Sequence, residues 1–535
     1  MVRDPQCERV YHAYQKGVMF KEQIQLYDTV ENNENFFIGR QWEGVEANGN
    51  PTPTFNFLKR VTLFQVATVS SDNITMQASP MSASALFGPQ QVEQVADVVS
   101  RQFDTLFERN KIPALTREFM RNAAVDGDGC TYTYFDPDAQ TGQAVKGDLV
   151  TEVVENTRVL FGNPYDRDVQ KQPWILITLR RPVEEVRRMA QRNGFDPDEI
   201  RPDEEQGGRT TSRYTGDQVT LLVYFRRDPE TGHIWAGKYT QKGQAEAFRD
   251  TGLKLYPITW MNWDYVQDCY HGHALISQLI PNQVFVNQLF AMVMRSLQTT
   301  AFPKIIYDKT RIPHWDGGVG RAIGVNGGDM NTIARIMDPA SVSPQISQFI
   351  DAAINYTQRF MGSSDVALGE ARPDNTSAIV ALQRASNAPL ELVKRNMYQA
   401  VEDLGHIYLD MMRAYYGVRL VRMRAFRTDM PLRMELRQTE MDTEFDFSVL
   451  EQLPLQLKLD VGASSFWSEI TSIQTLDNLL LQGKISLEDY LERIPEGYVS
   501  RKQELIDKLR GEKETAGGQH RSVMNTTGPG KEGGL

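Results

Sequence analysis

The sequence predicts an α+β protein of several domains, because strand hairpins and long helices occupy different parts of the chain. The first observation is a pair of hairpin patterns in the N-terminal half. The second is a nearly uncharged helical segment at 274–299, and the third is an apolar stripe at helical spacing over 376–416. With 535 residues, the chain is long enough for about three or four domains.

The composition is that of a protein with buried cores. Hydrophobic residues make up 41% of the chain and charged residues 24%. The N-terminal stretch MVRDPQCERV lacks the apolar run of a secretory signal. Cys7, Cys130 and Cys269 have no CxxC spacing, so neither a disulfide framework nor a zinc site is indicated, and a reducing cytosol is expected. The net charge of −11 argues against tight DNA binding over the whole surface, since phosphate binding needs clustered Lys and Arg.

Helices and hairpins alternate in the first half of the chain. Residues 6–34 and 89–124 have helical patterns. The strand-like TYTYFD at 131–136 is followed by the turn PDAQTG, and QVTLLVYFRRD at 218–228 is followed by PETG and HIWAGKY. Both are strand and turn signals. A short basic helix at 180–194 ends at an Asn-Gly pair between the two hairpins.

The segment 274–299 needs a test as a membrane span, because its only charge is Arg295. A spanning helix requires about 20 predominantly apolar residues. Here Pro281 and six amide side chains interrupt the run. The sequence therefore favours a helix packed between protein neighbours. Strand-like pieces with Gly-containing turns follow at 300–343, and a second helix is expected at 345–361.

A long helix is predicted over 376–416, because apolar residues recur there at steps of three and four. Asn375 or Thr376 is a suitable N-cap. The helix would be about 60 Å long, which suits a helix that crosses between parts of an assembly. Pro389 lies within it and removes one backbone hydrogen bond, so a kink near 385–389 is expected. The pivot is either Pro389 or the preceding Ser386-Asn387 pair.

The sequence carries no familiar motif for catalysis and no complete metal-binding pattern. The sequence has no GxxxxGK[ST] phosphate loop, no HExxH and no GxSxG elbow. His271-Gly-His273 could offer two metal ligands, but no pattern completes the set, so a structural role is favoured. Asp126-Gly-Asp128-Gly129 and Asp136-Pro-Asp138 are interpreted as turns. No catalytic residue, metal or cofactor is predicted, which favours a structural or interaction protein.

Four stretches of the chain, taken in order, resemble portal proteins of tailed bacteriophages. They are FFIGRQWEG with the downstream FNFLKRV, then MRNAAVDGDGCTYTYFD, then MNWDYVQDCYHGHALISQLIPNQVFVN, and finally ALGEARPDNTSAIVALQRAS. Together they extend over most of residues 10–510. Portals are rings, usually of twelve subunits, with wing, stem, clip and crown regions around a central DNA channel.

The resemblance implies a division of the chain into these regions. The expected boundaries are wing at 1–270 and 417–460, stem helices at 271–299 and 344–361, clip at 300–343, tunnel loop at 362–375, kinked tunnel helix at 376–416, crown at 461–510 and a disordered tail at 511–535.

The resemblance also implies a function without catalysis. The ring would conduct double-stranded DNA at one capsid vertex, during packaging and again during ejection. The implied partners are further copies of the chain, the major capsid protein, the terminase packaging motor and head-completion or tail adaptor proteins, with no membrane. The implied location is the virion, and the host cytoplasm during assembly. The alternatives are a phage-derived nucleic-acid-processing enzyme with an unrecognised site, and a generic ring-forming scaffold.

Candidate site residues follow from this assignment. In the tunnel loop, Arg372 is the candidate phosphate contact, and an ion pair with Glu370 or Asp374 is the alternative. Asn375 completes the loop set. Val286 and Leu289 are predicted at a subunit interface of the stem, because the helix around them is uncharged. In the clip, where basic residues outnumber acidic ones by one, the candidate contacts are Lys304, Lys309, Arg311, Arg321 and Arg335.

Overall fold

The computed structural model describes most of the chain in two compact units. The described residues are 7–72, 74–81, 88–142, 145–203, 217–301, 305–316, 323–336, 345–360, 388–425, 439–453, 455–461, 476–494 and 505. The first unit consists of Met1–Ser70 and Thr75–Asp460, and the second of Ser71–Ile74 and Val461–Leu535. Both helices and sheets are present, which is compatible with the predicted α+β class.

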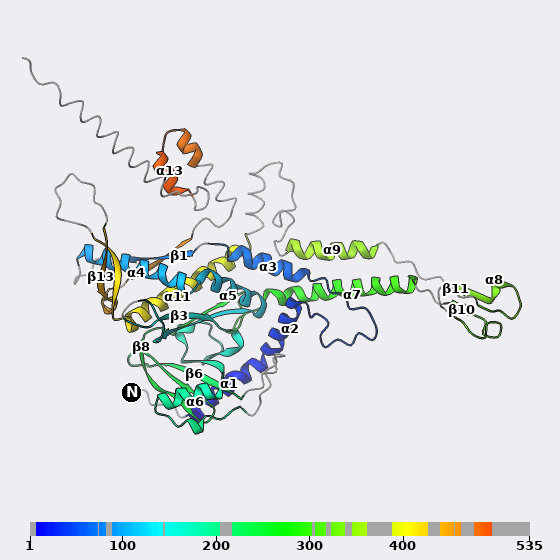
Figure 1. The fold of residues 1–535 in the computed structure, drawn as a ribbon, viewed down its shortest axis with the longest axis horizontal. Helices are drawn as coiled ribbons and strands as arrows, with labels where there is room; N and C mark the ends of the chain where they lie inside the picture. Colours follow the sequence, from blue (N-terminus) through cyan, green and yellow to red (C-terminus); the bar gives the residue numbers. More distant parts are fainter. Residues whose placement is uncertain are drawn as a thin grey trace, which may run out of the picture. The chain divides into compact units, whose positions relative to one another are not determined.

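Helices dominate the N-terminal part of the first unit (Figure 1). The predicted helix over 6–34 is found as two helices, since Gln25 between them adopts a left-handed conformation with φ 55°. The helical pattern at 89–124 is likewise confirmed as two helices, and Pro113 lies in the first turn of the second. The helices are α1 (Cys7–Gln23), α2 (Leu26–Ile38), α3 (Phe57–Val69), α4 (Pro89–Arg109) and α5 (Ile112–Asp126).

A three-stranded antiparallel sheet has the order β3-β2-β9. Its strands are β2 (Asp128–Asp136), β3 (Asp148–Val153) and β9 (Ile258–Asn262). The hairpin β2–β3 confirms the first predicted hairpin. On the outer side of β3, the Asn110 amide accepts from the Thr151 N–H at 2.9 Å and donates to the Leu149 carbonyl at 3.1 Å. This side chain therefore occupies hydrogen-bonding groups that an edge strand would otherwise expose.

A five-stranded antiparallel sheet, β4-β5-β6-β7-β8, lies between α1 and α6 (Val183–Arg192). Alternate residues of β6 face opposite sides, as strand geometry requires. Leu222 and Tyr224 belong to the cluster with Val10 of α1, whereas Val219 and Leu221 pack with α6. The strands are β4 (Val159–Phe161), β5 (Trp174–Pro182), β6 (Gln218–Arg227), β7 (Ile234–Tyr239) and β8 (Gln244–Leu253).

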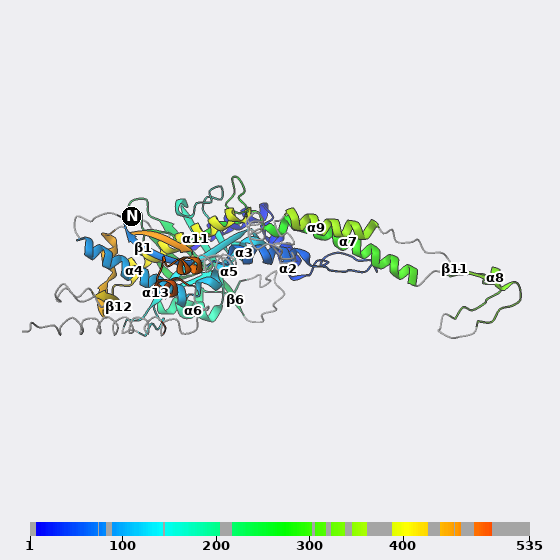
Figure 2. The same cartoon turned by 90° about the horizontal axis from the view of Figure 1, so that it is seen from above.

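Two long helices, α7 (Leu275–Ala301) and α9 (Gln345–Phe360), lie side by side in both views (Figure 1, Figure 2). They confirm the helices predicted on either side of 300–343. Within that segment the described residues form β10 (Ile305–Tyr307) paired with β11 (Ala334–Ile336), preceded by α8 (Met330–Ile333). No helix in the described ranges is both long and apolar enough to cross a membrane.

The described part of the predicted long helix is α11 (Leu390–Tyr415), and its apolar stripe is buried. It packs on β9, β8, α3 and the short helix η4 (Phe447–Glu451). Strands follow it, as predicted: β12 (Val418–Ala425) pairs with β13 (Thr439–Asp446), and β14 (Leu455–Val461) pairs with β1 (Ile74–Pro80).

The described residues of the second unit include one short helix with a complete N-terminal cap. In α13 (Leu487–Arg493), the Ser486 hydroxyl accepts from the Asp489 N–H at 3.1 Å, and the Asp489 carboxylate accepts from the Ser486 N–H at 3.2 Å. This reciprocal pair is a capping box, which starts a helix where two backbone donors would otherwise be unpaired.

Gly405 of α11 allows the close approach of β1, which gives a test of this packing. A Cβ atom at this position would lie 2.1 Å from Sδ of Met76, a side chain that is 1% exposed. We expect Gly405→Ala to lower the free energy of unfolding by about 1–3 kcal/mol through overpacking. Urea denaturation measures it. In a Met76→Ala background the clash with Met76 is absent and only a tight contact with Leu457 remains, so the same substitution should cost much less. Equal losses in both backgrounds would contradict the packing argument.

Candidate functional site

The root of α7 is built around one fully buried carboxylate, that of Asp128 at the start of β2. It accepts hydrogen bonds from the side chain of Asn262 at 2.7 Å and from the side chain of Asn156 at 3.0 Å. It also accepts from the Gly272 N–H at 2.7 Å and from Nδ1 of His271 at 2.6 Å. One side chain therefore joins β2, β9, the 3-10 turn at 156–158 and the turn that precedes α7.

This cluster brings together two motifs that are 143 residues apart and that the sequence presents as separate local features. They are the Asp-Gly-Asp-Gly run at 126–129 and the His-Gly-His run at 271–273. Glycine is required on both sides of the contact. A Cβ at Gly127 would lie 2.7 Å from the carbonyl oxygen of Gly272, and a Cβ at Gly272 would lie 2.9 Å from the carbonyl oxygen of Gly127. The structural role predicted for both motifs fits this arrangement.

The ionisable groups around Asp128 are buried, and burial is the main cause of the shifts in their pKa values. The amino group of Lys21 on α1 donates to the carbonyls of Asn156 and Val159, both at 2.6 Å. Desolvation lowers the pKa of Lys21 from 10.5 to about 7, while the charge of Asp128 opposes this shift. Desolvation likewise lowers the pKa of His271, whose Nε2 has no hydrogen-bond partner among the described residues. Neighbouring Asp126 shifts the other way, because burial raises its pKa to about 7.

Further along α7, amide side chains attach the helix to its own chain. Gln283 donates to the Phe55 carbonyl at 2.7 Å and to the side chain of Asn287 at 2.9 Å. Asn287 in turn donates to the side chain of Gln41 at 2.6 Å. Phe55 also stacks on Phe290, with ring centroids 3.9 Å apart. Amides can be buried in this way because they form hydrogen bonds without the desolvation cost of an ion.

Val286 and Leu289, predicted at a subunit interface, are 0% and 9% exposed in the single chain. Val286 lies near the buried amide of Gln283 on the helix surface, whereas Leu289 is one turn from the exposed Phe285. Their own chain accounts for their burial, so no neighbouring subunit is needed to explain it. The assignment of these two residues to a subunit interface therefore stays a prediction.

Some of the predicted clip residues lie in the described part of the chain. Lys309, Arg311 and Arg335 are exposed, and Arg311 pairs with Asp308 at 3.5 Å. The structure does not bring these three side chains into one described contact. Lys304 and Arg321 lie outside the described residues.

The predicted tunnel loop is also outside the described residues, and with it Glu370, Arg372, Asp374 and Asn375. Pro389 is described. It immediately precedes the first residue of α11, with φ −64° and ψ −31°, which are helical angles. Because the residues before 388 are not described, the kink at Pro389 stays a prediction.

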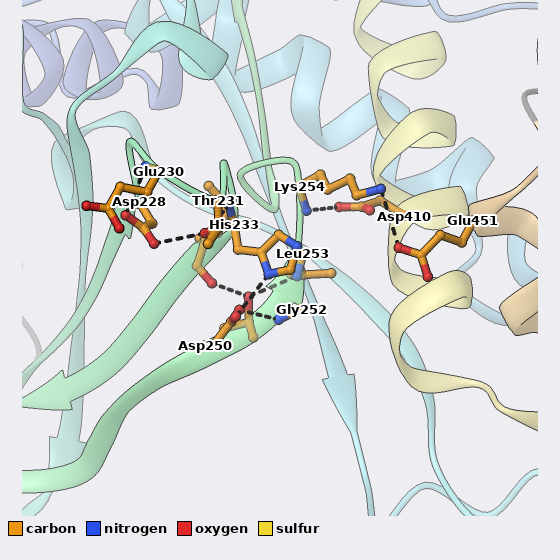
Figure 3. A network of polar contacts seen from close by, with 12 residues as sticks. Asp228, Glu230, Thr231, His233, Asp250, Gly252, Leu253, Lys254, Asp410 and Glu451 are labelled. Atoms are coloured by element: carbon orange, nitrogen blue, oxygen red, sulfur yellow. Dashed lines mark hydrogen bonds and ion pairs between the residues drawn. The ribbon is translucent and has the colours of Figure 1, made fainter. Parts of the chain in front are cut away.

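The C-terminal half of α11 is fixed to the β8–β9 connection by Asp410 (Figure 3). Its carboxylate accepts from the backbone N–H groups of Lys254 at 2.7 Å and Leu255 at 2.9 Å. It also accepts from Arg413, at 2.8 Å. The Lys254 ammonium group lies 3.7 Å from Glu451, which follows in the chain after β13. Sequence patterns do not reveal this contact, because its partners are more than 150 residues apart.

A groove of about 1160 Å³ between the two sheets bears on the enzyme alternative. Its walls include aromatic side chains, and two of its carboxylates are paired: Glu152 with the Tyr134 hydroxyl at 2.8 Å, and Glu246 with Lys238 at 2.9 Å. In the described ranges, no group of three or more His, Cys, Asp or Glu residues is placed to hold a metal ion.

Comparison with known families identifies part of the chain. Residues 238–429, from the end of β7 past β12, match the family model described as Phage P22-like portal protein. The matched segment is 192 of the 535 residues and contains α7, α9 and α11. The match supports a phage portal protein and confirms the resemblance found in the sequence. The comparison with curated proteins gave no match.

The buried position of Lys21 predicts a pH dependence of stability. The pKa of Lys21 is lower in the folded chain than in the unfolded chain, because burial disfavours the charged amine. The stability of the fold with a neutral Lys21 is therefore complete above the unfolded pKa of 10.5, and it is lost as the pH falls towards 7. Between about pH 7 and pH 8.5, the free energy of unfolding of the wild type should rise relative to Lys21→Met by up to about 1.4 kcal/mol per pH unit. Urea denaturation across this range measures it. The exposed-site variant Lys242→Met should keep the wild-type slope, and a Lys21→Met slope equal to wild type would contradict the assignment.

The burial of Val286 predicts that a charge there damages the single chain before any assembly step. We expect Val286→Asp to cost about 4 kcal/mol or more, because it buries an unpaired carboxylate. Circular dichroism and limited proteolysis of dilute protein report the loss of folding. Gln288→Asp, at an exposed position of the same helix, should remain folded. A folded Val286→Asp chain would contradict this placement.

Proposed function

We propose that this chain is the portal protein of a tailed phage, forming a ring-shaped channel through which double-stranded DNA is packaged and ejected. The observation that carries the proposal is the family match over 238–429. Two of the four sequence stretches in portal order support it independently, because they lie wholly before the matched segment.

We infer the regional assignment from the order of elements. The helices α7 and α9 enclose 300–343 in the chain and pack on each other, as expected of two stem helices on either side of a clip. The wing would comprise 1–270 and 417–460, the tunnel loop 362–375 and the tunnel helix 376–416. The crown would be 461–510, followed by the tail at 511–535.

The proposed mechanism is passive conduction. A channel that passes every sequence must not read bases, and it must not hold phosphates so tightly that DNA stalls. A net charge of −11 per chain, with only local basic contacts, meets both demands. In this proposal Arg372 of the tunnel loop contacts phosphates, and Glu370, Asp374 and Asn375 limit the strength of that contact. The clip residues Lys304, Lys309, Arg311, Arg321 and Arg335 would face the motor, the adaptors or the DNA.

The proposal places the ring at one vertex of the virion capsid and in the host cytoplasm during assembly. Its partners would be the major capsid protein, the terminase motor and the head-completion or tail adaptor proteins. The portal ring would supply no catalysis of its own, so the motor would provide the energy for packaging. Nuclease and ATPase assays on the purified chain are accordingly expected to be blank.

Electron microscopy of the purified full chain tests the proposal directly. We expect rings with a central hole, usually of twelve subunits, and a matching mass in analytical ultracentrifugation. A chain that stays monomeric over all protein and salt concentrations would refute the proposal. The role of the tunnel loop has its own test in packaging reactions with Arg372→Glu rings. Rings of normal shape should package DNA more slowly, and an unchanged rate would remove Arg372 from the DNA path.

A further inference from the structure

The two packed helices α7 and α9 leave large apolar side chains uncovered in the single chain. Phe285 and Met292 on α7 are 47% and 56% exposed, and Phe349 and Tyr356 on α9 are 60% and 56% exposed. On each helix the two residues are seven positions apart, so they lie on one face with about 10.5 Å between them. We call these four side chains the stem patch.

The stem patch differs from the outward face of an ordinary surface helix, which carries charged residues. On α7 the exposed stripe runs through Pro281, Phe285, Gln288 and Met292, and the first charge is Arg295. The opposite side of the helix holds the buried Val286 and the amides that bind the chain's own loop. Both sides of α7 are therefore suited to contact with protein, although one chain covers only one of them.

The area of the stem patch is that of an interaction site. Each side chain leaves about 100 Å² exposed, so the four together offer about 400 Å². A stable interface buries about 800 Å² on each partner. The stem patch can thus supply part of the apolar area of such contacts, and other residues must supply the remaining area.

The low charge of these helices indicates which partner fits. The whole chain carries −11, so two copies repel each other wherever their acidic surfaces meet. The 27 residues of α7 carry one charge, Arg295, and the 16 residues of α9 carry two, Asp351 and Arg359. A second copy of the same acidic chain can approach here without like-charge repulsion.

We propose that the stem patch is the surface through which one copy of the chain contacts the next along α7 and α9. The inference rests on the ring proposed above and names the contact within it. It assigns the contact to side chains that one chain leaves uncovered, rather than to Val286 and Leu289, which are already buried.

Charged substitutions in the stem patch test this contact. Phe285→Asp and Phe349→Asp should fold like the wild type, because both positions are exposed, but should raise the concentration needed for ring formation by about tenfold or more. Analytical ultracentrifugation measures this concentration. The matched control is Leu392→Asp on α11, where the side chain is 69% exposed, and it should assemble normally. Wild-type assembly by both stem variants would overturn the proposal.

Photo-crosslinking gives a second readout that does not depend on the stability of charged variants. Benzoylphenylalanine replaces Phe285 or Phe349 in assembled protein, and Leu392 serves again as the control position. We expect crosslinked dimers and longer ladders from the two stem positions and none from the control. Rings that yield only crosslinks within one chain would reject the stem contact and leave the portal assignment standing. A wild-type chain that forms no rings would reject the portal assignment as well.

Discussion

The buried carboxylate of Asp128 is the constraint on which the arrangement of the first unit depends. An isolated buried charge is costly, and here four donors from three separate segments offset that cost. Satisfying this one group fixes the end of β9, the turn at 156–158 and the start of α7 relative to β2. Lys21 adds α1 to the same cluster through the carbonyl of Asn156. The direction in which α7 leaves the sheets is therefore set by a polar contact in the core.

From this root, α7 depends on a different kind of contact. Ser277, Gln283 and Asn287 form hydrogen bonds to α2 and to the loop that follows it. An entirely apolar face would pack there without specifying rotation about the helix axis, whereas paired amides fix which residues turn inward. The result is a helix with one polar and specific face and one face, containing Phe285 and Met292, that is apolar and exposed.

Periodic patterns in the sequence were sufficient to predict local elements. The β6–β7 hairpin, the short helix α6 with Gly194 after it and the buried stripe of α11 follow from spacing and turn residues alone. Contacts between distant segments were not predictable in the same way. The uncharged segment predicted a helix packed between protein neighbours, but it did not reveal that Gln283 and Asn287 bind Phe55 and Gln41, because no sequence pattern indicates where a buried amide finds its partner. For the same reason, the two glycine motifs could be interpreted as structural without revealing that they meet.

The bonds that hold α7 to its own chain also determine how the stem responds to ions. Salt screens exposed charge pairs over about 8–10 Å, so a surface pair such as Arg101 and Asp97 weakens as ionic strength rises. The side-chain amides of Gln283 and Asn287 carry no net charge and are buried, so salt has little effect on their hydrogen bonds. In the proposed channel, DNA brings a dense atmosphere of counterions past this helix. The contacts that hold α7 to its own chain would then keep the same geometry in dilute cytoplasm and beside concentrated nucleic acid.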